Sequence, residues 1–486
     1  MKKILFATYM AVIFIGCSSD VTTENNLDDN NDTNNTNFTV QPTKEANNPI
    51  DIQNGEKLFV ANCATCHGGD AKGKTGPNIV GITSQNISDE ILGNSAMVFM
   101  QGLFSEEDYR VMAVFLDELE RKDGGVDEFS QERAILGEKL YFDKNLSSTR
   151  SISCATCHNP LQAFIDNRFD SNPVYGALSV GDDNTTLGGR NSPTVAYAKF
   201  IPDFLKIDED TYIGGQFWDG RANNLKEQAK GPFLDAAEMM MPNESAVVSR
   251  VKENRDYIEE FQNLYGDDIF NNDEKAYDAI AEVIAEYEKI PEISPFNSKY
   301  DRSKLPYYHI DHYEMTDQEK YGYLLFFSDE THCKSCHTTS SATESSIETF
   351  TNSHYENIGI PKNIEALLAR DGNTDKIDLG LGEDINESKH YGKFKVPTLR
   401  NVAVTAPYMS NGVFKELKTV IKYFDYMAGN GHPINPETNQ PWREAEVNST
   451  INHETLKTLK PLTDEKIDAL ESFLKLLTDK EYEGLL

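Results

Sequence analysis

Amphipathic helices are the main pattern along this chain of 486 residues. Ser105-Glu-Glu-Asp108 supplies a helix cap and an acidic first turn, and apolar residues follow at helical spacing up to Leu119. Thr463-Asp-Glu465 opens a second helix of the same kind, with an apolar stripe that runs to Leu477. Evidence for strands is thin. The pattern predicts a mostly α protein with little sheet.

A short amphipathic segment recurs three times, as Gly55-Glu-Lys-Leu-Phe59, Gly137-Glu-Lys-Leu-Tyr-Phe142 and Gly322-Tyr-Leu-Leu-Phe-Phe327. Helices that turn aromatic side chains toward a common kind of site would explain all three. Packing in a generic core would explain the aromatic residues but not their recurrence. Between these segments, residues 167–192 and 371–390 are rich in Gly, Asn and Asp and predict long loops.

Six of the seven cysteines belong to three Cys-x-x-Cys-His motifs, one after each recurring segment. This spacing is typical of covalent haem c attachment, in which two thiols add to the haem vinyl groups and the histidine ligates the iron. A redox dithiol or half a zinc site does not explain a histidine in every copy. The motifs predict three haem c groups, at Cys63, Cys66 and His67, at Cys154, Cys157 and His158, and at Cys333, Cys336 and His337.

The N-terminus predicts export. Lys2 and Lys3 precede an apolar run over residues 4–15, which is too short to span a bilayer permanently. Gly16-Cys17 then resembles a bacterial lipobox, so Cys17 is the expected lipidation site; an ordinary signal peptide is the alternative. Residues 18–48 carry almost no apolar side chain, which predicts a disordered tether. We expect a lipoprotein anchored to a bacterial membrane, in the periplasm or at the cell surface.

The formal net charge of −33 at pH 7 argues against binding to nucleic acid or anionic lipid and permits a basic electron-donor protein. Length and motif spacing predict three cytochrome c-like haem domains in tandem after the tether, with a linker at residues 122–126. The expected segments are a lipoprotein signal at 1–17, a tether at 18–50, a monohaem domain at 51–122, and haem domains at 126–304 and 305–486.

The second axial ligand decides what each haem can do, because two strong ligands favour electron transfer and an open face can bind peroxide. In the first domain Met97 and Met100 both precede the closing helix, and we prefer Met97 as the ligand. In the third, Met409 lies in a polar, turn-rich segment after Val396. A methionine exposed in such a segment would have little packing role, so Met409 is the expected ligand.

The middle haem differs, because no histidine occurs between His158 and His309. The only methionines in that interval are Met239, Met240 and Met241, directly after Glu238. We therefore expect an open distal side. A carboxylate such as Glu238 can take a proton from one peroxide oxygen and return it to the other, which assists cleavage of the O–O bond.

From about residue 129 to residue 478 the chain resembles the bacterial dihaem cytochrome c peroxidase / MauG superfamily. The resemblance rests on the haem spacing and on three tracts: Arg190-Asn-Ser-Pro-Thr194, Gln216-Phe-Trp-Asp-Gly-Arg-Ala222, and Pro397-Thr-Leu-Arg-Asn401 with Ala406-Pro-Tyr-Met409. With its extra N-terminal haem domain, the whole chain is similar to the trihaem peroxidases of that superfamily.

The resemblance implies that His158 holds the peroxidatic haem and that His337 with Met409 holds a high-potential electron-transfer haem. It implies an inter-haem role for Trp218 and distal-pocket roles for Gln228 and Glu238. It also implies one calcium ion between the domains, with Asn191, Thr405 and Pro407 at the ligand positions, where hard oxygen ligands are expected. A homodimer is common among such peroxidases.

One departure from the family affects the expected mechanism. Many family members carry a distal histidine in the loop after the first dihaem motif, yet residues 159–168 contain none. MauG-type enzymes share that lack, but they have tyrosine where this chain has Met409. The combination favours a peroxidase whose site is always open.

Three functions follow. The first is reduction of hydrogen peroxide to water. A small cytochrome c, a cupredoxin or quinol would supply the electrons, which pass from the haem of His67 through that of His337 and Trp218 to the haem of His158. The second is a MauG-like oxidase that modifies a partner protein or an organic substrate. The third is a non-enzymatic electron-transfer cytochrome, which requires a sixth ligand on the middle haem, such as one of the three consecutive methionines.

Overall fold

The computed structural model describes residues 130–339 and 348–486, together with a few positions of the first domain. Those positions are Gly55, residues 57–61, Cys63, Ala64, Ser105, Asp108, Tyr109, Val111, Met112 and Leu116. The predicted signal, the tether, Cys17, Cys66, His67, Met97 and Met100 lie outside the described residues. The chain divides into two compact units, Met1–Leu119 and Glu120–Leu486.

Within the first unit, the described residues contain the predicted helix cap. The Asp108 N–H donates to Ser105 Oγ at 3.2 Å, and the Ser105 N–H donates to the Asp108 carboxylate at 2.8 Å. Met112 and Leu116 are each 1% exposed, so these two residues of the predicted apolar stripe are buried. Phe59, in the first recurring segment, is also 1% exposed.

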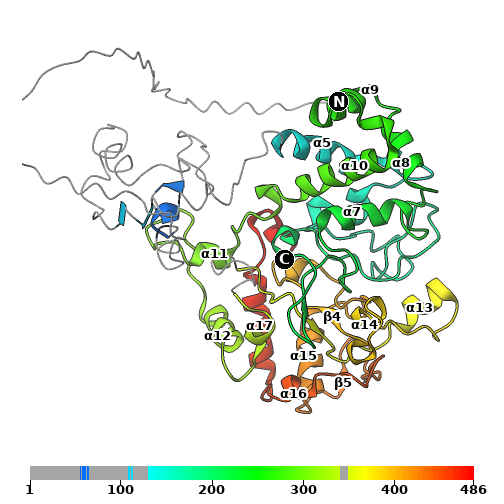
Figure 1. Ribbon diagram of the computed structural model, residues 1–486. Helices are drawn as coiled ribbons and strands as arrows, with labels where there is room; N and C mark the ends of the chain where they lie inside the picture. The colour runs from blue at the N-terminus through cyan, green and yellow to red at the C-terminus, as the bar shows by residue number, and fades with distance from the viewer. Residues whose placement is uncertain are drawn as a thin grey trace, which may run out of the picture. The chain divides into compact units, whose positions relative to one another are not determined.

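The second unit is built from helices joined by long loops (Figure 1). Its α-helices are α5 (Ser130–Phe142), α6 (Cys154–Cys157), α7 (Leu225–Leu234), α8 (Glu244–Val251), α9 (Arg255–Tyr265), α10 (Asp273–Glu288), α11 (Lys299–Ser303), α12 (Asp317–Phe326), α13 (Ile364–Asp371), α14 (Leu381–Asp384), α15 (Leu417–Met427), α16 (His453–Leu456) and α17 (Asp464–Lys475). Single 3₁₀ turns occur at Lys144–Leu146, Pro160–Gln162, Ala198–Phe200, Ile269–Asn271, Pro291–Ile293, Cys333–Ser335, Ser388–His390, Val402–Val404 and Lys480–Leu485.

Strand structure in the described residues is limited to three antiparallel pairs of two-residue strands. β1 (Leu205–Lys206) pairs with β2 (Tyr212–Ile213), β3 (Tyr355–Glu356) with β4 (Phe394–Lys395), and β5 (Ile434–Asn435) with β6 (Gln440–Pro441). In register, Leu205 lies opposite Ile213, Tyr355 opposite Lys395, and Ile434 opposite Pro441. The expectation of a mostly α protein with little sheet is confirmed.

A first hydrophobic core extends from Leu136 to Ile293 and contains the packed pair α5 and α10. The two helices approach closely at Gly137, where an added Cβ would lie 1.8 Å from the Val283 carbonyl oxygen and 3.0 Å from Tyr287 Cβ. Only glycine permits that approach. Figure 1 shows α5, α7, α8, α9 and α10 gathered on one side of this unit.

A second core extends from Tyr300 to Leu477 and contains α12 and α17. These helices meet at Gly322, where an added Cβ would lie 1.9 Å from the Ala469 carbonyl oxygen and 2.9 Å from Phe473 Cβ. α17 begins as the sequence predicts, because Thr463 Oγ1 accepts a hydrogen bond from the Lys466 N–H. The recurring glycine segments thus form the same helix crossing in both cores.

The two predicted loops differ from each other. Residues 167–192 contain no helix, and their strand pairing is one isolated antiparallel bridge between Val180 and Leu187. Residues 371–390 contain the four-residue α14 and the turn Ser388–His390, so short helical segments interrupt the predicted loop there. Within the part of the chain that the structure describes, no helix has both the length and the apolarity that a bilayer span requires.

Candidate functional site

Both described Cys-x-x-Cys-His motifs fold into one tight turn. In α6 the His158 N–H donates to the Cys154 carbonyl at 2.9 Å, and in the Cys333–Ser335 turn the His337 N–H donates to the Cys333 carbonyl at 3.0 Å. The turn keeps two thiols and one imidazole close together, as two thioether bonds and one iron ligand require. Burial raises the pKa of Cys157 and of Cys336 to about 12.

Each histidine is oriented by a main-chain carbonyl. His158 Nδ1 lies 3.2 Å from the Phe164 oxygen, and His337 Nδ1 lies 2.9 Å from the Phe350 oxygen. Burial lowers the pKa of both imidazoles, that of His337 to about 4, so both are neutral. A neutral imidazole that donates through Nδ1 presents Nε2 as a metal ligand.

A cavity of about 480 Å³ lies beside the first of these histidines. Cys154, Cys157 and His158 line it, and apolar side chains such as Leu225 and Phe233 form part of its wall. Its volume lies in the range of about 300–1,000 Å³ that is usual for sites of small ligands and cofactors. The two thiols, the imidazole and the apolar wall fit a covalently bound haem c.

The distal residues predicted from sequence line the same cavity. Gln228 comes from α7, whose N-cap Asn224 accepts a hydrogen bond from the Glu227 N–H. Glu238 follows in the turn after α7, where its main-chain oxygen accepts from the Asp182 N–H at 2.9 Å. Burial, aided by the charge of Asp235, raises the pKa of Glu238 to about 7. Such a carboxyl can both accept and donate a proton near neutral pH.

His158 is the sole histidine among the described residues that line this cavity. Of the three consecutive methionines only Met239 reaches the lining. Met239 and Met241 are each 4% exposed and belong to the first hydrophobic core, which gives both a packing role.

Trp218 lines the cavity beside His158 and also a second, smaller cavity of about 150 Å³. Its Nε1 donates to the Asn191 carbonyl at 2.8 Å, and its own carbonyl accepts from the Lys395 N–H at 2.8 Å. These two hydrogen bonds hold the indole in the wall that the cavities share.

Met409 lines the smaller cavity together with Thr349 and Thr351, the two neighbours of Phe350. The expectation that Met409 is exposed is wrong: it is half-buried and packs against the cluster of Phe414, Tyr423 and Trp442. Packing therefore accounts in part for a methionine at this position, and its role as an iron ligand stays a prediction.

The residues predicted to bind calcium also meet at the smaller cavity, which Asn191, Thr405 and Pro407 all line. They offer only neutral oxygen ligands. The Lys395 side chain lines the same cavity and donates to the Gly215 carbonyl. Burial lowers the pKa of Lys395 to about 7.

Sequence reasoning missed two charged features of the larger cavity. Glu288, at the end of α10, is 5% exposed, and burial raises its pKa to about 8. Arg190 lines the cavity and pairs with Asp219 at 2.5 Å and with Asp378 at 2.7 Å. Arg190 opens one of the tracts shared with the superfamily, which was a usable signal, whereas nothing in the sequence distinguished Glu288 from other acidic helix residues.

Comparison with known proteins gives two family matches. Residues 131–305 match the family described as di-haem cytochrome c peroxidase, and residues 50–116 match the family described as cytochrome C oxidase, cbb3-type, subunit III. The methylamine utilization protein MauG of Paracoccus denitrificans is 42% identical over 357 residues, which cover 73% of this chain and 90% of that protein.

Two further relatives are peroxidases. The cytochrome c551 peroxidase of Nitrosomonas europaea is 31% identical, over 60% of this chain and 72% of its own. The crystal structure of the diheme peroxidase BthA from Burkholderia thailandensis superposes with a TM-score of 0.62 at 27% identity, covering 73% of this chain and 87% of that one. The chain belongs to the dihaem cytochrome c peroxidase/MauG family and carries an additional N-terminal cytochrome c-type domain.

Proposed function

We propose that this protein is an exported, lipid-anchored trihaem peroxidase that reduces hydrogen peroxide to water. The observation that supports it most is the lining of the larger cavity, in which Glu238 and Gln228 accompany His158 and the described residues contribute no second histidine. When bound there, haem c supplies an iron that takes up peroxide and exchanges electrons.

The residues of the chain have separate tasks in this proposal. The Gln228 amide orients peroxide by hydrogen bonding. The Glu238 carboxylate would take the proton from one peroxide oxygen and deliver it to the other, which leaves as water. Trp218 carries electrons between the sites of His337 and His158; it lines the cavity of His158 and the smaller cavity that Met409 also lines. Electrons enter at the site of His67, and calcium at Asn191, Thr405 and Pro407 would brace the wall beside Trp218.

The first prediction concerns Glu238→Gln in the haem-loaded protein. Glutamine keeps the size and polarity of the side chain but cannot accept a proton, so peroxide turnover with a reduced donor should fall by about 10²–10⁴-fold. Rapid-mixing kinetics on protein that was never pre-reduced measures it, and the wild type should turn over without a lag.

Glu227→Gln is the matched control. Glu227 lies one residue from Gln228 but is exposed and pairs with Lys230 at 2.9 Å. Peroxide turnover by the Glu227→Gln variant should equal that of the wild type. Full activity in Glu238→Gln would remove the assigned proton-transfer role.

The second candidate, a MauG-like oxidase, is supported by the 42% identity to MauG. It predicts a long-lived two-electron-oxidised state after peroxide addition and slow turnover with ordinary electron donors. A non-enzymatic cytochrome would need Met239 as a sixth ligand. An absorption spectrum of the oxidised protein that is wholly low-spin would favour that third function over both enzymes.

A further inference from the structure

Tyr197 shares packing neighbours with the segments that orient both haem-binding histidines. It belongs to the first core, as does Phe164, whose carbonyl orients His158. The Arg400 guanidinium lies 5.5 Å from the ring centroid of Tyr197 and 5.4 Å from that of Phe350, whose carbonyl orients His337. Tyr197 also lines the smaller cavity together with Trp218 and Met409. In the proposed function, electrons pass this part of the molecule, because Trp218 and Met409 line the same cavity.

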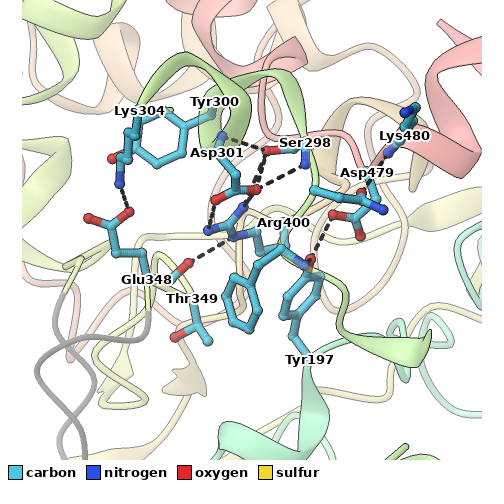
Figure 2. A network of polar contacts seen from close by, with 12 residues as sticks. Tyr197, Ser298, Tyr300, Asp301, Lys304, Glu348, Thr349, Arg400, Asp479 and Lys480 are labelled. Carbon is cyan, nitrogen blue, oxygen red and sulfur yellow. Dashed lines mark hydrogen bonds and ion pairs between the residues drawn. The ribbon is translucent and has the colours of Figure 1, made fainter. Parts of the chain in front are cut away.

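The phenol of Tyr197 has a carboxylate as its hydrogen-bond acceptor (Figure 2). Its hydroxyl donates to Asp479 Oδ1 at 2.6 Å and accepts from the Phe296 N–H at 3.1 Å. Tyr197 is 2% exposed and Asp479 is 0% exposed. Asn401 Nδ2 donates to the other Asp479 oxygen at 2.8 Å, and the Asp479 N–H donates back to Asn401 Oδ1 at 2.8 Å. The carboxylate is thus fixed against the phenol without competing water.

This acceptor distinguishes Tyr197 from the other described tyrosines that line the cavities. Tyr141 donates to the His158 carbonyl, and Tyr408 donates to the Val402 carbonyl. An amide oxygen is too weak a base to take a proton from an oxidised phenol, whereas a carboxylate can take it. Burial raises the pKa of Asp479 to about 6, so the group is ionised at neutral pH yet holds a transferred proton more readily than an exposed aspartate.

We propose that Tyr197 and Asp479 form a proton-coupled redox site that supplies one electron during the reaction with peroxide. The proposal rests on the proposed peroxidase function, which provides the oxidant. Hydrogen peroxide takes up two electrons and two protons to give two waters. The two protons come from solvent, and one of the two electrons would come from the haem group held at His158. The other electron leaves the Tyr197 phenol; its O–H bond breaks and an O–H bond forms on Asp479 Oδ1, which yields a neutral tyrosyl radical and a neutral carboxylic acid. An electron from the site of His337 then restores the phenol as the proton returns.

The test is rapid-freeze electron paramagnetic resonance on the haem-loaded full chain, mixed with one equivalent of peroxide in the absence of donor. A radical signal near the free-electron g value should appear within milliseconds and narrow when the protein is grown with ring-deuterated tyrosine. Tyr197→Phe should lower its yield at least tenfold. Asp479→Asn, which keeps a polar side chain but removes the base, should do the same.

Tyr277→Phe is the matched control, since Tyr277 is 2% exposed and donates to the Lys230 carbonyl. It should leave the signal and the peroxide turnover unchanged. Haem absorbance and thermal unfolding show whether each variant has folded. A tyrosyl signal that survives Tyr197→Phe overturns the proposal, as does peroxide consumption with no tyrosyl signal in the wild type.

A second oxidant separates this proposal from the peroxidase function. A photogenerated ruthenium(III) complex removes one electron from the haem-loaded protein without peroxide. If the wild type consumes no peroxide but the ruthenium oxidant yields a radical that Tyr197→Phe abolishes, the peroxidase function fails and the redox site stands. If neither peroxide nor the ruthenium complex yields that radical, the proposed redox site fails.

Discussion

The Glu238 carboxyl lines the larger cavity, and burial raises its pKa to about 7. The ordinary pKa of this carboxyl, as in the unfolded chain, is 4.5. Between pH 4.5 and about 7 the folded protein therefore keeps a proton on Glu238 that the unfolded chain has released. Because the unfolded chain loses this proton at lower pH than the folded protein, the free energy of unfolding falls as pH rises from 4.5 to about 7. In the proposed mechanism, the same equilibrium sets the fraction of the enzyme that can accept a proton from peroxide.

The second prediction is a pH profile that follows from this equilibrium. The ratio kcat/KM for peroxide should rise about tenfold per pH unit below pH 7 and level off above it, because only the carboxylate form is a base. Steady-state kinetics from pH 5 to pH 9 measures the profile. In Glu238→Gln the step should vanish and leave a low, flat rate. A step of unchanged position in that variant would assign the titration to another group, with Glu288 the first to test.

At the scale of elements, the packed helix pairs α5–α10 and α12–α17 have the same packing arrangement. In each pair a glycine of the first helix lies against a main-chain carbonyl of the second, Gly137 against Val283 and Gly322 against Ala469. Four residues after each glycine comes a buried aromatic residue, Tyr141 or Phe326. Tyr141 lines the larger cavity, so the crossing helps to position its wall.

The third prediction is that Gly137→Ala destabilises the protein. Glycine inside a helix usually costs about 0.5–1 kcal/mol relative to alanine, so the substitution alone would stabilise. Here the added methyl group would lie 1.8 Å from the Val283 oxygen, and separating the helices should cost about 1–3 kcal/mol. The midpoint of urea unfolding of the haem-loaded protein measures the change.

Gly231→Ala in α7 is the control, since its Cβ would make an ordinary contact at 3.5 Å with Phe217. We expect this variant to be neutral or slightly more stable than the wild type. Equal stability of Gly137→Ala and the wild type would mean that the helix pair can shift without loss.

The sequence predicted those features that depend on local pattern. The haem motifs, the caps at Ser105 and Thr463 and the recurring glycine segments are all readable from spacing. It did not predict the burial of Glu288, the packing of Met409 or the position of α14, because each depends on contacts between residues distant in the chain. The expected groups Trp218, Gln228 and Glu238 line one cavity, although their roles stay predictions.

At the scale of the whole second unit, the two hydrophobic cores are joined by a buried ion pair (Figure 2). Arg400 is 1% exposed. Its guanidinium binds both oxygens of Asp301 at 2.6 and 2.9 Å. Its plane also lies 4.8 Å from the ring centroid of Phe296, which packs on the first core, and 5.8 Å from that of Tyr300 in the second.

The fourth prediction is that Arg400→Met costs about 3–5 kcal/mol, because it leaves the Asp301 carboxylate without its partner in a mostly buried site. Both cores should unfold at lower denaturant, as measured by near-ultraviolet circular dichroism. Arg443→Met is the control: Arg443 binds Glu365 with the same two-bond geometry, at 2.8 and 2.7 Å, but on the surface. That change should cost less than about 1 kcal/mol. Equal effects of the two changes would mean that the cores are joined by other contacts.

The repeated glycine crossing has a consequence for the ancestry of the molecule. Gly137 and Gly322 lead to Tyr141 and Phe326 by the same spacing that separates Gly55 from the buried Phe59. We infer that the haem-binding modules descend from one ancestral module by duplication. On this descent, the reactivity that we propose for the site at His158 arose after the duplication, while the inherited helix crossing held the rest of the module in place.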